Sequence, residues 1–447
     1  MAVFNHEYVG RFLSMVNSYR KSFYLLTSLF FMWGLITVLV DSLIPRLREI
    51  FELTYFQAGL VQFAFFIAYG LVSIPAGKLL QRIGYQRGII VGLAVMGIGC
   101  LLFLPAASLR WYGLFLLAYF ILASGMTLLQ VAANPFVTVL GEPATAASRL
   151  NLSQAFNSLG TTVAPALGAI FILSDSVLSS DELARLDQSS KSAYFSIEAS
   201  AVQGPFLILA LMLFMLAAVI LKSHLPKLLK ESPDSQYGQV LKDRKLVLGA
   251  IGIFVYVGAE VTIGSYLINY FLDMNLAELI RENRIMQAIV GQIQPTELAL
   301  VDDNGVVGAF VMFYWGGAVV GRFFGYYLMR VFSPNKILCW AALVAIFMIL
   351  ISIASEGFLS LWSILGVGLF NSVMFPTIFS IALEDLEELK AQGSGILCTA
   401  IVGGAFIPPL YGFLTDQVGF KIAFILLLVC YLYIWLYGRQ SQKNATV

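Results

Sequence analysis

The chain has 447 residues, of which 59% are hydrophobic and only 12% are charged, and its mean hydropathy is +0.84. A soluble domain has roughly 45–50% apolar and about 25% charged residues, so this composition indicates a polytopic membrane protein. Basic and acidic residues number 27 and 26, and the resulting net charge of +1 excludes nucleic-acid binding through bulk charge. A dozen spanning helices of about 20 residues each would also leave no room for a large soluble domain.

Histidine and cysteine usage argues against enzyme and metal chemistry. The two histidines, His6 and His224, lie in predicted tails or loops, and the four cysteines stand alone in apolar runs. The sequence contains no CxxC or HExxH motif. We therefore predict that the protein is not an enzyme and has neither a metal site nor a cofactor.

Twelve apolar runs follow one another in two sets of six. They cover residues 23–45, 55–80, 86–106, 111–140, 147–173 and 202–222, and then 245–272, 305–329, 335–354, 358–383, 392–414 and 419–438. This spacing predicts an all-α membrane protein with twelve transmembrane helices in two six-helix bundles. The predicted parts are an N-terminal tail 1–22, a first bundle 23–222, a charged linker 223–244, a second bundle 245–438 and a C-terminal tail 439–447.

The distribution of lysine and arginine predicts the orientation. Segments on the side of the termini hold 19 of the 27 basic residues, counting Arg322 in a loop at 321–336. The two longest loops on the other side, 174–200 and 273–303, are rich in acids. The excess of positive charge predicts that both termini are cytoplasmic.

The two sets of six runs share a pattern of residues, which indicates a parallel duplication. The matching pairs are Gly34 and Asp41 with Gly258 and Ser265, Gly77 and Arg82 with Gly325 and Arg330, Gln130 and Pro135 with Asn371 and Pro376, and Gly160 and Pro165 with Gly403 and Pro408. Duplicated bundles are common in secondary transporters, whose binding site lies between the repeats near the membrane centre. The prolines either kink their helices statically or supply bends for a rocking bundle.

Two acids lie inside predicted spans, at Asp41 and Glu260. A charge at the membrane centre costs roughly 2.5–3.5 kcal/mol on insertion scales, so such acids usually face a partner or a water-filled cavity. A carboxyl in this setting can take up and release a proton, as an ion-coupled carrier requires. The alternative is that a neighbouring helix holds each carboxyl purely for packing.

Uncharged amides form a second set of polar residues within the spans: Gln62, Gln130, Asn134, Gln154, Asn157 and Asn371. Amides both donate and accept hydrogen bonds, so a neutral amide-lined cavity suits the hydroxyls of a sugar. Gln154 and Asn157 are three residues apart and share one helical face. Hydrogen bonding between helices is the alternative role. Trp33 and Trp315 also lie inside spans, where they either stack on a sugar ring or pack in the core.

The loop from Gly77 through Arg82 and Gly84 to Arg87 lies between two of these runs. Together with the twelve runs in two halves, this loop resembles the major facilitator superfamily, and the resemblance covers essentially the whole chain. The resemblance implies two six-helix bundles and an inner-gate role for Gly77, Arg82, Gly84 and Arg87, with Arg330 as their counterpart in the second half. Gln81 stands where the family usually has an acid.

Longer strings narrow the resemblance to the fucose permease family of sugar symporters. They are Phe31 to Gly34 with Asp41, Leu129 to Pro135, Arg149 to Ser158, and Phe375 to Phe379. Fucose permeases have an acid where this chain has Gln130. The segment Tyr256 to Ser265 instead resembles the glucose/galactose and N-acetylglucosamine transporters. The resemblance implies ion coupling at Asp41 and Glu260, and sugar contact at Gln130, Gln154 and Asn157.

These observations together predict a cation-coupled hexose importer of the bacterial inner membrane, monomeric, whose partners are a sugar and the lipid bilayer. Protons are the favoured coupling ion because carboxylates alone suffice for them; sodium stays open through nearby hydroxyls such as Thr262 and Ser265. The alternatives are a proton-driven exporter of lipophilic compounds and a sugar sensor that does not transport.

Overall fold

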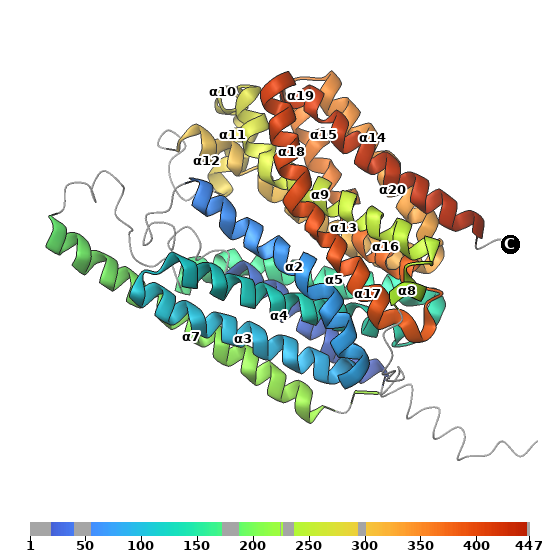
Figure 1. The fold of residues 1–447 in the computed structure, drawn as a ribbon. Coiled ribbons are helices and arrows are strands. Elements are labelled where there is room, and N and C mark those ends of the chain that lie inside the picture. Colours follow the sequence, from blue (N-terminus) through green and yellow to red (C-terminus); the bar gives the residue numbers. More distant parts are fainter. Residues whose placement is uncertain are drawn as a thin grey trace, which may run out of the picture. The chain divides into compact units, whose positions relative to one another are not determined.

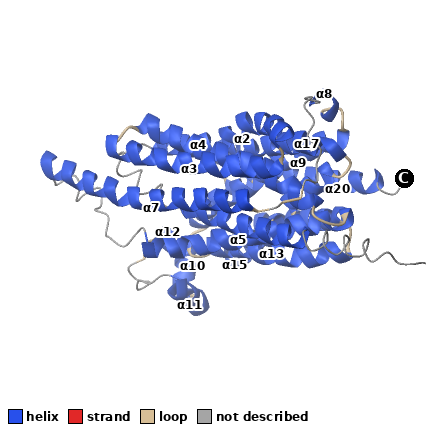
Figure 2. Ribbon diagram, turned by 90° about the horizontal axis from the view of Figure 1, so that it is seen from below, coloured by secondary structure: helices blue, strands red, loops and turns tan. Residues whose placement is uncertain are grey.

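The computed structural model describes residues 19–39, 55–171, 187–223, 225–226, 237–293 and 301–444, and this part of the chain is helical with no strand (Figure 2). Eleven helices within it are long and apolar enough to cross a membrane. The helix α5, Ala146–Phe171, adds a further 26 residues, and its asparagines, its single glutamine and its serines make it less apolar. The predicted all-α membrane fold is confirmed.

The helices gather into two compact units. Figure 1 colours the chain along its sequence and labels these helices. Unit 1 takes its described residues from 1–146, 156–240 and 385–399. Its helices are Tyr19–Leu39, α2 Tyr55–Ile83, α3 Tyr85–Leu109, α4 Tyr112–Val139, most of α5, α7 Gln188–Lys222, α8 Tyr237–Val240 and α17 Lys390–Thr399, with short 3-10 turns at Pro143–Thr145 and Glu387–Leu389.

Unit 2 takes its described residues from 147–155, 241–384 and 400–447. Its helices are α9 Arg244–Asp273, α10 Leu276–Glu282, α11 Arg284–Ile293, α12 Asp303–Gly308, α13 Val311–Val331, α14 Pro334–Ala354, α15 Gly357–Asn371, α16 Met374–Leu383, α18 Gly403–Val418, α19 Phe420–Ala423 and α20 Ile425–Asn444, with a 3-10 turn at Ala400–Val402.

The two compact units do not coincide with the two halves that repeat in the sequence. Residues 147–155, from the first half of α5, belong to unit 2, and residues 385–399, which include α17, belong to unit 1. Each of these segments is polar enough to bind backbone groups of the unit that receives it. Ser394 Oγ of α17, for example, donates to the carbonyl of Val131 in α4 at 2.9 Å. The predicted bundle boundaries therefore stay a prediction.

Two segments predicted as loops are helical, and their N-terminal caps explain why. Within the predicted loop 273–303, Asn283 Oδ1 accepts hydrogen bonds from the backbone N–H groups of Ile285 and Met286 at the start of α11. The helix α7 begins at 188 rather than 202, where the Asp187 carboxylate accepts from Ser189. The hydrogen bonds from the Ser189 and Ser190 side chains lower the pKa of Asp187 to about 2.

Proline breaks a span that the sequence predicts as continuous. The predicted run 358–383 is divided into α15 and α16, and Pro376 lies in the first turn of α16. Proline has no N–H and its ring repels the carbonyl four residues earlier, so the carbonyl of Ser372 loses its helical partner. That free carbonyl becomes an acceptor inside the membrane-spanning part of unit 2.

A duplicated glycine pair allows the same close helix contact in each unit. A Cβ atom on Gly160 of α5 would collide with the carbonyl oxygen of Phe31 in the helix Tyr19–Leu39. A Cβ atom on Gly403 of α18 would collide in the same way with the carbonyl of Phe254 in α9. Small residues at such positions let helix backbones approach closely. The resulting van der Waals contacts hold the helices together in a membrane, where lipid is as apolar as the side chains and the hydrophobic effect does not drive helix association.

We expect Gly160→Ala to lower the apparent melting temperature in detergent by several degrees. Overpacking costs about 1–3 kcal/mol, and each kcal/mol moves the transition by roughly 2–4 °C in a unit of this size. Gly204→Ala in α7 is the matched control, since a Cβ there meets nothing within 4 Å. Equal melting temperatures for the two variants would show that this contact does not constrain the fold.

Candidate functional site

An acid in the middle of α9 is the centre of a polar network in unit 2. The hydroxyl of Tyr256, one turn earlier, donates to Glu260 Oε1 at 2.7 Å. The hydroxyl of Tyr314 in α13 donates to the backbone carbonyl of Glu260 at 3.3 Å. Both tyrosines are about 1% exposed, whereas Glu260 is only half-buried. The carboxyl group is therefore held in place by a hydrogen bond, on a side chain that is not fully buried.

An amide of α15 extends this network. Asn371 Nδ2 donates to the hydroxyl of Tyr314 at 2.8 Å. The hydroxyl of Tyr431 in α20 lies within hydrogen-bonding reach of the Asn371 side chain, although Asn371 Oδ1 and this hydroxyl form no hydrogen bond of ideal geometry within the described residues. A hydroxyl group of a ligand or a water can offer this buried pair a better-aligned hydrogen bond.

The positive charge that acts on the Glu260 carboxylate is the guanidinium of Arg322. Arg322 lies in the interior of α13, so counting it in an inner loop was wrong. Its Nε donates to the Ser372 carbonyl that Pro376 frees, and its Nη1 donates to the carbonyl of Gln154, each at 3.2 Å. A basic residue inside an apolar run is itself a functional signal.

The first half of α5 is bound to α13 through backbone carbonyls around Arg322. Asn151 Nδ2 donates to the carbonyl of Arg322 at 2.6 Å, and Ser148 Oγ donates to the carbonyl of Tyr326 at 2.9 Å. With the bond from Arg322 to Gln154, three side chains hold this segment in unit 2. Asn151, Tyr256, Tyr314, Arg322 and Tyr431 were not predicted as site residues.

Unit 1 carries a comparable amide–tyrosine pair. Gln130 of α4 donates from Nε2 to the hydroxyl of Tyr69 in α2 at 2.9 Å. Gln130 is half-buried, and Tyr69 is 2% exposed. Asn371 and Gln130 each lie five residues before a proline, and each donates to a tyrosine. The repeated pattern seen in the sequence therefore reappears in side-chain contacts.

The amide of Asn157 is used between helices. Its Nδ2 donates to the carbonyl of Phe30 at 3.0 Å, which is the packing role left open for it. Trp33 is 7% exposed and its ring lies 5.5 Å from that of Phe30, so it packs within unit 1. Gln154 is buried in unit 2, and its own carbonyl accepts from Arg322.

The remaining predicted residues are scattered. Asn134 is fully buried in α4, and Gln62 is exposed on α2. Trp315 is 46% exposed and its ring meets that of Tyr314 edge-on at 5.1 Å. Asp41 lies outside the described residues.

The predicted inner-gate residues lie around the turn between α2 and α3 and at the end of α13. Gly84 adopts a φ of 79°, a backbone conformation that favours glycine, and it begins α3 directly after α2 ends. Gly77 lies against the hydroxyl of Tyr237 and the carbonyl of Ala391. Arg82, Arg87 and Arg330 are exposed.

The fold and the polar groups within its spans define a helical membrane transporter. The chain belongs to the Major Facilitator Superfamily, whose family model matches residues 25–401. The members of this family to which the chain is similar are transporters and not enzymes.

The chain resembles several named members of the family. It is 49% identical to a glucose/galactose transporter of Brucella abortus over 422 residues, 94% of this chain and 93% of that protein. It is 34% identical to the L-fucose-proton symporter of Escherichia coli K12 over 439 residues, 96% and 95% of the two chains. Among solved structures, it matches the Major Facilitator Superfamily transporter FucP in the outward conformation with a TM-score of 0.84 and 33% identity, covering 95% of this chain and 99% of that one.

We expect the charges of Arg322 and Glu260 to be coupled. Arg322→Gln should destabilise the protein more in the wild-type background than in Glu260→Gln, because the carboxylate then loses its positive neighbour. The difference should be on the order of 1 kcal/mol in a double-mutant cycle of apparent melting temperatures. Arg439→Gln with Glu260→Gln is the control pair and should be additive; additivity of the first pair would refute the coupling.

Proposed function

We propose that this protein imports a neutral hexose, of the glucose/galactose or N-acetylglucosamine type, together with protons by alternating access. The half-buried carboxyl of Glu260, hydrogen-bonded to Tyr256 and subject to the charge of Arg322, carries the proposal. The names of two relatives support it: glucose/galactose transporter at 49% identity and L-fucose-proton symporter at 34% identity.

The proton is bound by Glu260 and by Asp41. Protonation removes the negative charge of Glu260, so the positive charge of Arg322 is no longer balanced and its hydrogen bonds to backbone carbonyls become its main stabilisation. One of those carbonyls belongs to Gln154 of α5. Proton uptake in α9 is thereby linked to the segment of α5 that unit 2 holds, which gives the coupling ion a physical route to a conformational change.

The sugar is recognised by neutral polar groups. Gln130 with Tyr69, and Asn371 with Tyr314, offer donors and acceptors fixed by their mutual hydrogen bonds. Asn371 Oδ1 and the Tyr431 hydroxyl, which are neighbours without an ideally aligned hydrogen bond, are atoms to which a sugar hydroxyl can bind. The charge of Arg322 is offset by the Glu260 carboxylate beside it, and the amide–tyrosine pairs are neutral, so these groups favour a neutral substrate over a sugar phosphate or an organic acid.

The cellular setting follows from the same proposal. The protein lies in a bacterial inner membrane with both termini cytoplasmic, acts as a monomer, and binds only its sugar, its coupling ion and lipid. The relatives' names favour sugar import over the export of lipophilic compounds. If dyes or antibiotics compete with hexoses for transport, the exporter hypothesis is correct instead, and if hexoses bind without being transported, the protein is a sensor.

We expect Glu260→Gln and Asp41→Asn each to lower proton-driven hexose accumulation in liposomes at least tenfold, because neither amide can carry the proton. Downhill exchange of labelled hexose should persist, since the amides still form hydrogen bonds. Glu278→Gln in the exposed helix α10 makes the same chemical change away from the spans and should leave uptake unaltered. If a sodium gradient drives accumulation and a proton gradient does not, the coupling ion is sodium and not the proton.

We expect Gln130→Leu to raise the KM for hexose at least tenfold, since each lost hydrogen bond to a buried partner costs about 1–3 kcal/mol. Tyr69→Phe should raise it less, because it removes only the group that orients the amide. Tyr112→Phe is the matched control, because the Tyr112 hydroxyl that it removes donates to the backbone carbonyl of Gln57. An unchanged KM in both Gln130→Leu and Tyr69→Phe would remove this pair from the sugar site.

A further inference from the structure

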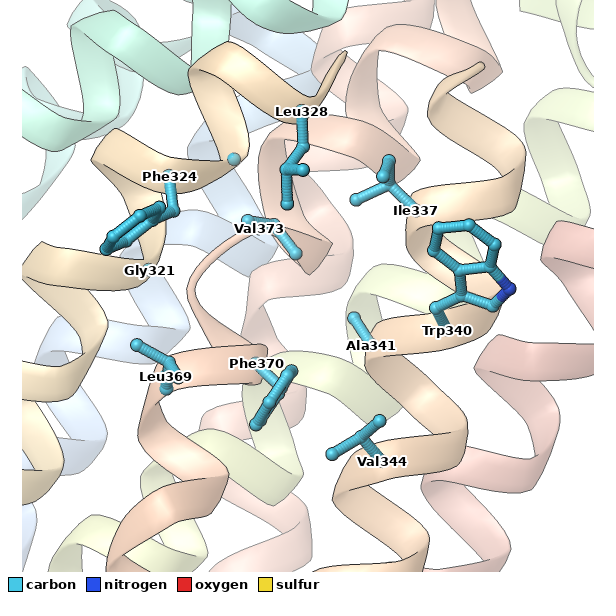
Figure 3. Close-up of a pocket in the computed structure, with 11 residues that line it drawn as sticks. Gly321, Phe324, Leu328, Ile337, Trp340, Ala341, Val344, Leu369, Phe370 and Val373 are labelled. Carbon is cyan, nitrogen blue, oxygen red and sulfur yellow. The ribbon is translucent and has the colours of Figure 1, made fainter. Parts of the chain in front are cut away.

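A groove that the sugar mechanism does not use lies on unit 2 between α13, α14 and α15 (Figure 3). Its volume is about 380 Å³. Gly321 and Leu328 of α13 line one wall, Ile337, Trp340 and Val344 line the opposite wall on α14, and Phe370 of α15 lies at its floor. In each wall the lining positions recur every three or four residues, so the groove runs along the helices rather than across them.

The lining is apolar, and the groove opens between exposed apolar side chains. Leu328 is 43% exposed and Trp340 is 52% exposed, as expected for positions that face hydrocarbon. The ring of Trp340 meets that of Phe332, which is 40% exposed, at 5.4 Å. Aromatic side chains of this kind gather at the boundary between hydrocarbon and headgroups, so this end of the groove lies at the membrane surface.

Positive charge is concentrated at that same end. Arg330, in the last turn of α13, and Lys336, in the first turn of α14, are both exposed. Neither forms an ion pair within the residues that the structure describes; Arg330 only stacks on the ring of Tyr326 at 5.6 Å. The 21-residue helix α14 begins here and adds the positive end of its dipole, and Asn335 Oδ1 lacks a hydrogen-bond partner in the described residues.

We propose that this groove binds one acyl chain of an anionic phospholipid, with the lipid phosphate held by Arg330 and Lys336. An apolar groove that ends in unpaired basic side chains and a helix N-terminus matches a molecule with an apolar tail and a negative head. A zwitterionic lipid would fill the groove equally well but would gain less from the two charges. A second copy of this chain in this groove would have to bring an acid to Arg330 and Lys336, and the test below includes that outcome.

The test measures lipid binding to the purified full-length protein in detergent. Native mass spectrometry should detect retained phosphatidylglycerol at about 30-fold lower concentration than phosphatidylcholine with the same acyl chains, because each of two basic side chains near an anionic headgroup contributes about fivefold. The double variant Arg330→Gln with Lys336→Gln should abolish this preference. Arg439→Gln removes one charge from α20, stacked on Trp435, and should preserve it.

A second pair of variants tests the groove itself. Val344→Trp should fill the groove and weaken binding of both lipids at least fivefold, whereas Leu343→Trp, at the neighbouring position that does not line it, should not. Each variant must elute as a single monodisperse species with wild-type helical content.

Four outcomes would overturn the proposal. Equal affinity for the two lipids, or a preference that survives the double charge variant, would remove the phosphate site. Displacement of the lipid by soluble glycerol phosphate alone would mean that the groove plays no part. A dimer that Val344→Trp dissociates would make a second copy of the chain the occupant. The groove contains none of the residues proposed to bind the sugar or the proton, so lipid binding and hexose transport can be measured and can fail independently.

Discussion

A charged side chain inside a membrane span needs polar partners close to it, and in unit 2 this constraint determines which groups surround Arg322. Arg322 meets it with two backbone carbonyls, those of Ser372 and Gln154, and with the nearby carboxylate of Glu260. A helical carbonyl is a better acceptor for another donor when its own hydrogen bond is missing, and Pro376 provides that for Ser372. The break between α15 and α16 is thus part of what makes an intramembrane arginine tolerable.

In each unit a proline leaves a helical carbonyl without its usual hydrogen bond, and a different side chain donates to that carbonyl. Pro135 in α4 frees the carbonyl of Val131, which accepts from Ser394, just as Pro376 frees the carbonyl of Ser372 for Arg322. Gene duplication preserved the proline and the amide five residues before it, while the donor changed from a neutral hydroxyl to a charged guanidinium. A charge now sits beside Glu260 in unit 2, and unit 1 keeps a neutral amide–tyrosine pair suited to a sugar.

The apolar face and the polar interior of unit 2 share their helices. α13 presents Gly321 and Leu328 to the groove, and it carries Arg322 and Tyr314 toward Glu260 and Asn371. A Cβ atom on Gly321 would collide with the carbonyl of Leu369, so α13 and α15 are in close contact along this line. A lipid that fills the groove therefore touches the same helices that position the acid, which gives the membrane a direct means to influence unit 2.

The sequence by itself determined the membrane class, the all-α fold, the duplication and Glu260, because hydropathy and the rarity of acids in spans are local signals. It also marked Gln130 and Asn371 through their spacing from proline. It did not identify Tyr69, Tyr256, Tyr314 or Tyr431, since a tyrosine in an apolar run looks like ordinary core until its hydroxyl has a partner. The helical parts of 273–303 were missed because short amphipathic helices are less apolar than spans. Only the tertiary structure showed that Arg322 lies near Glu260 and that residues 147–155 of α5 pack in unit 2, because both depend on carbonyls from distant helices that no sequence pattern brings together.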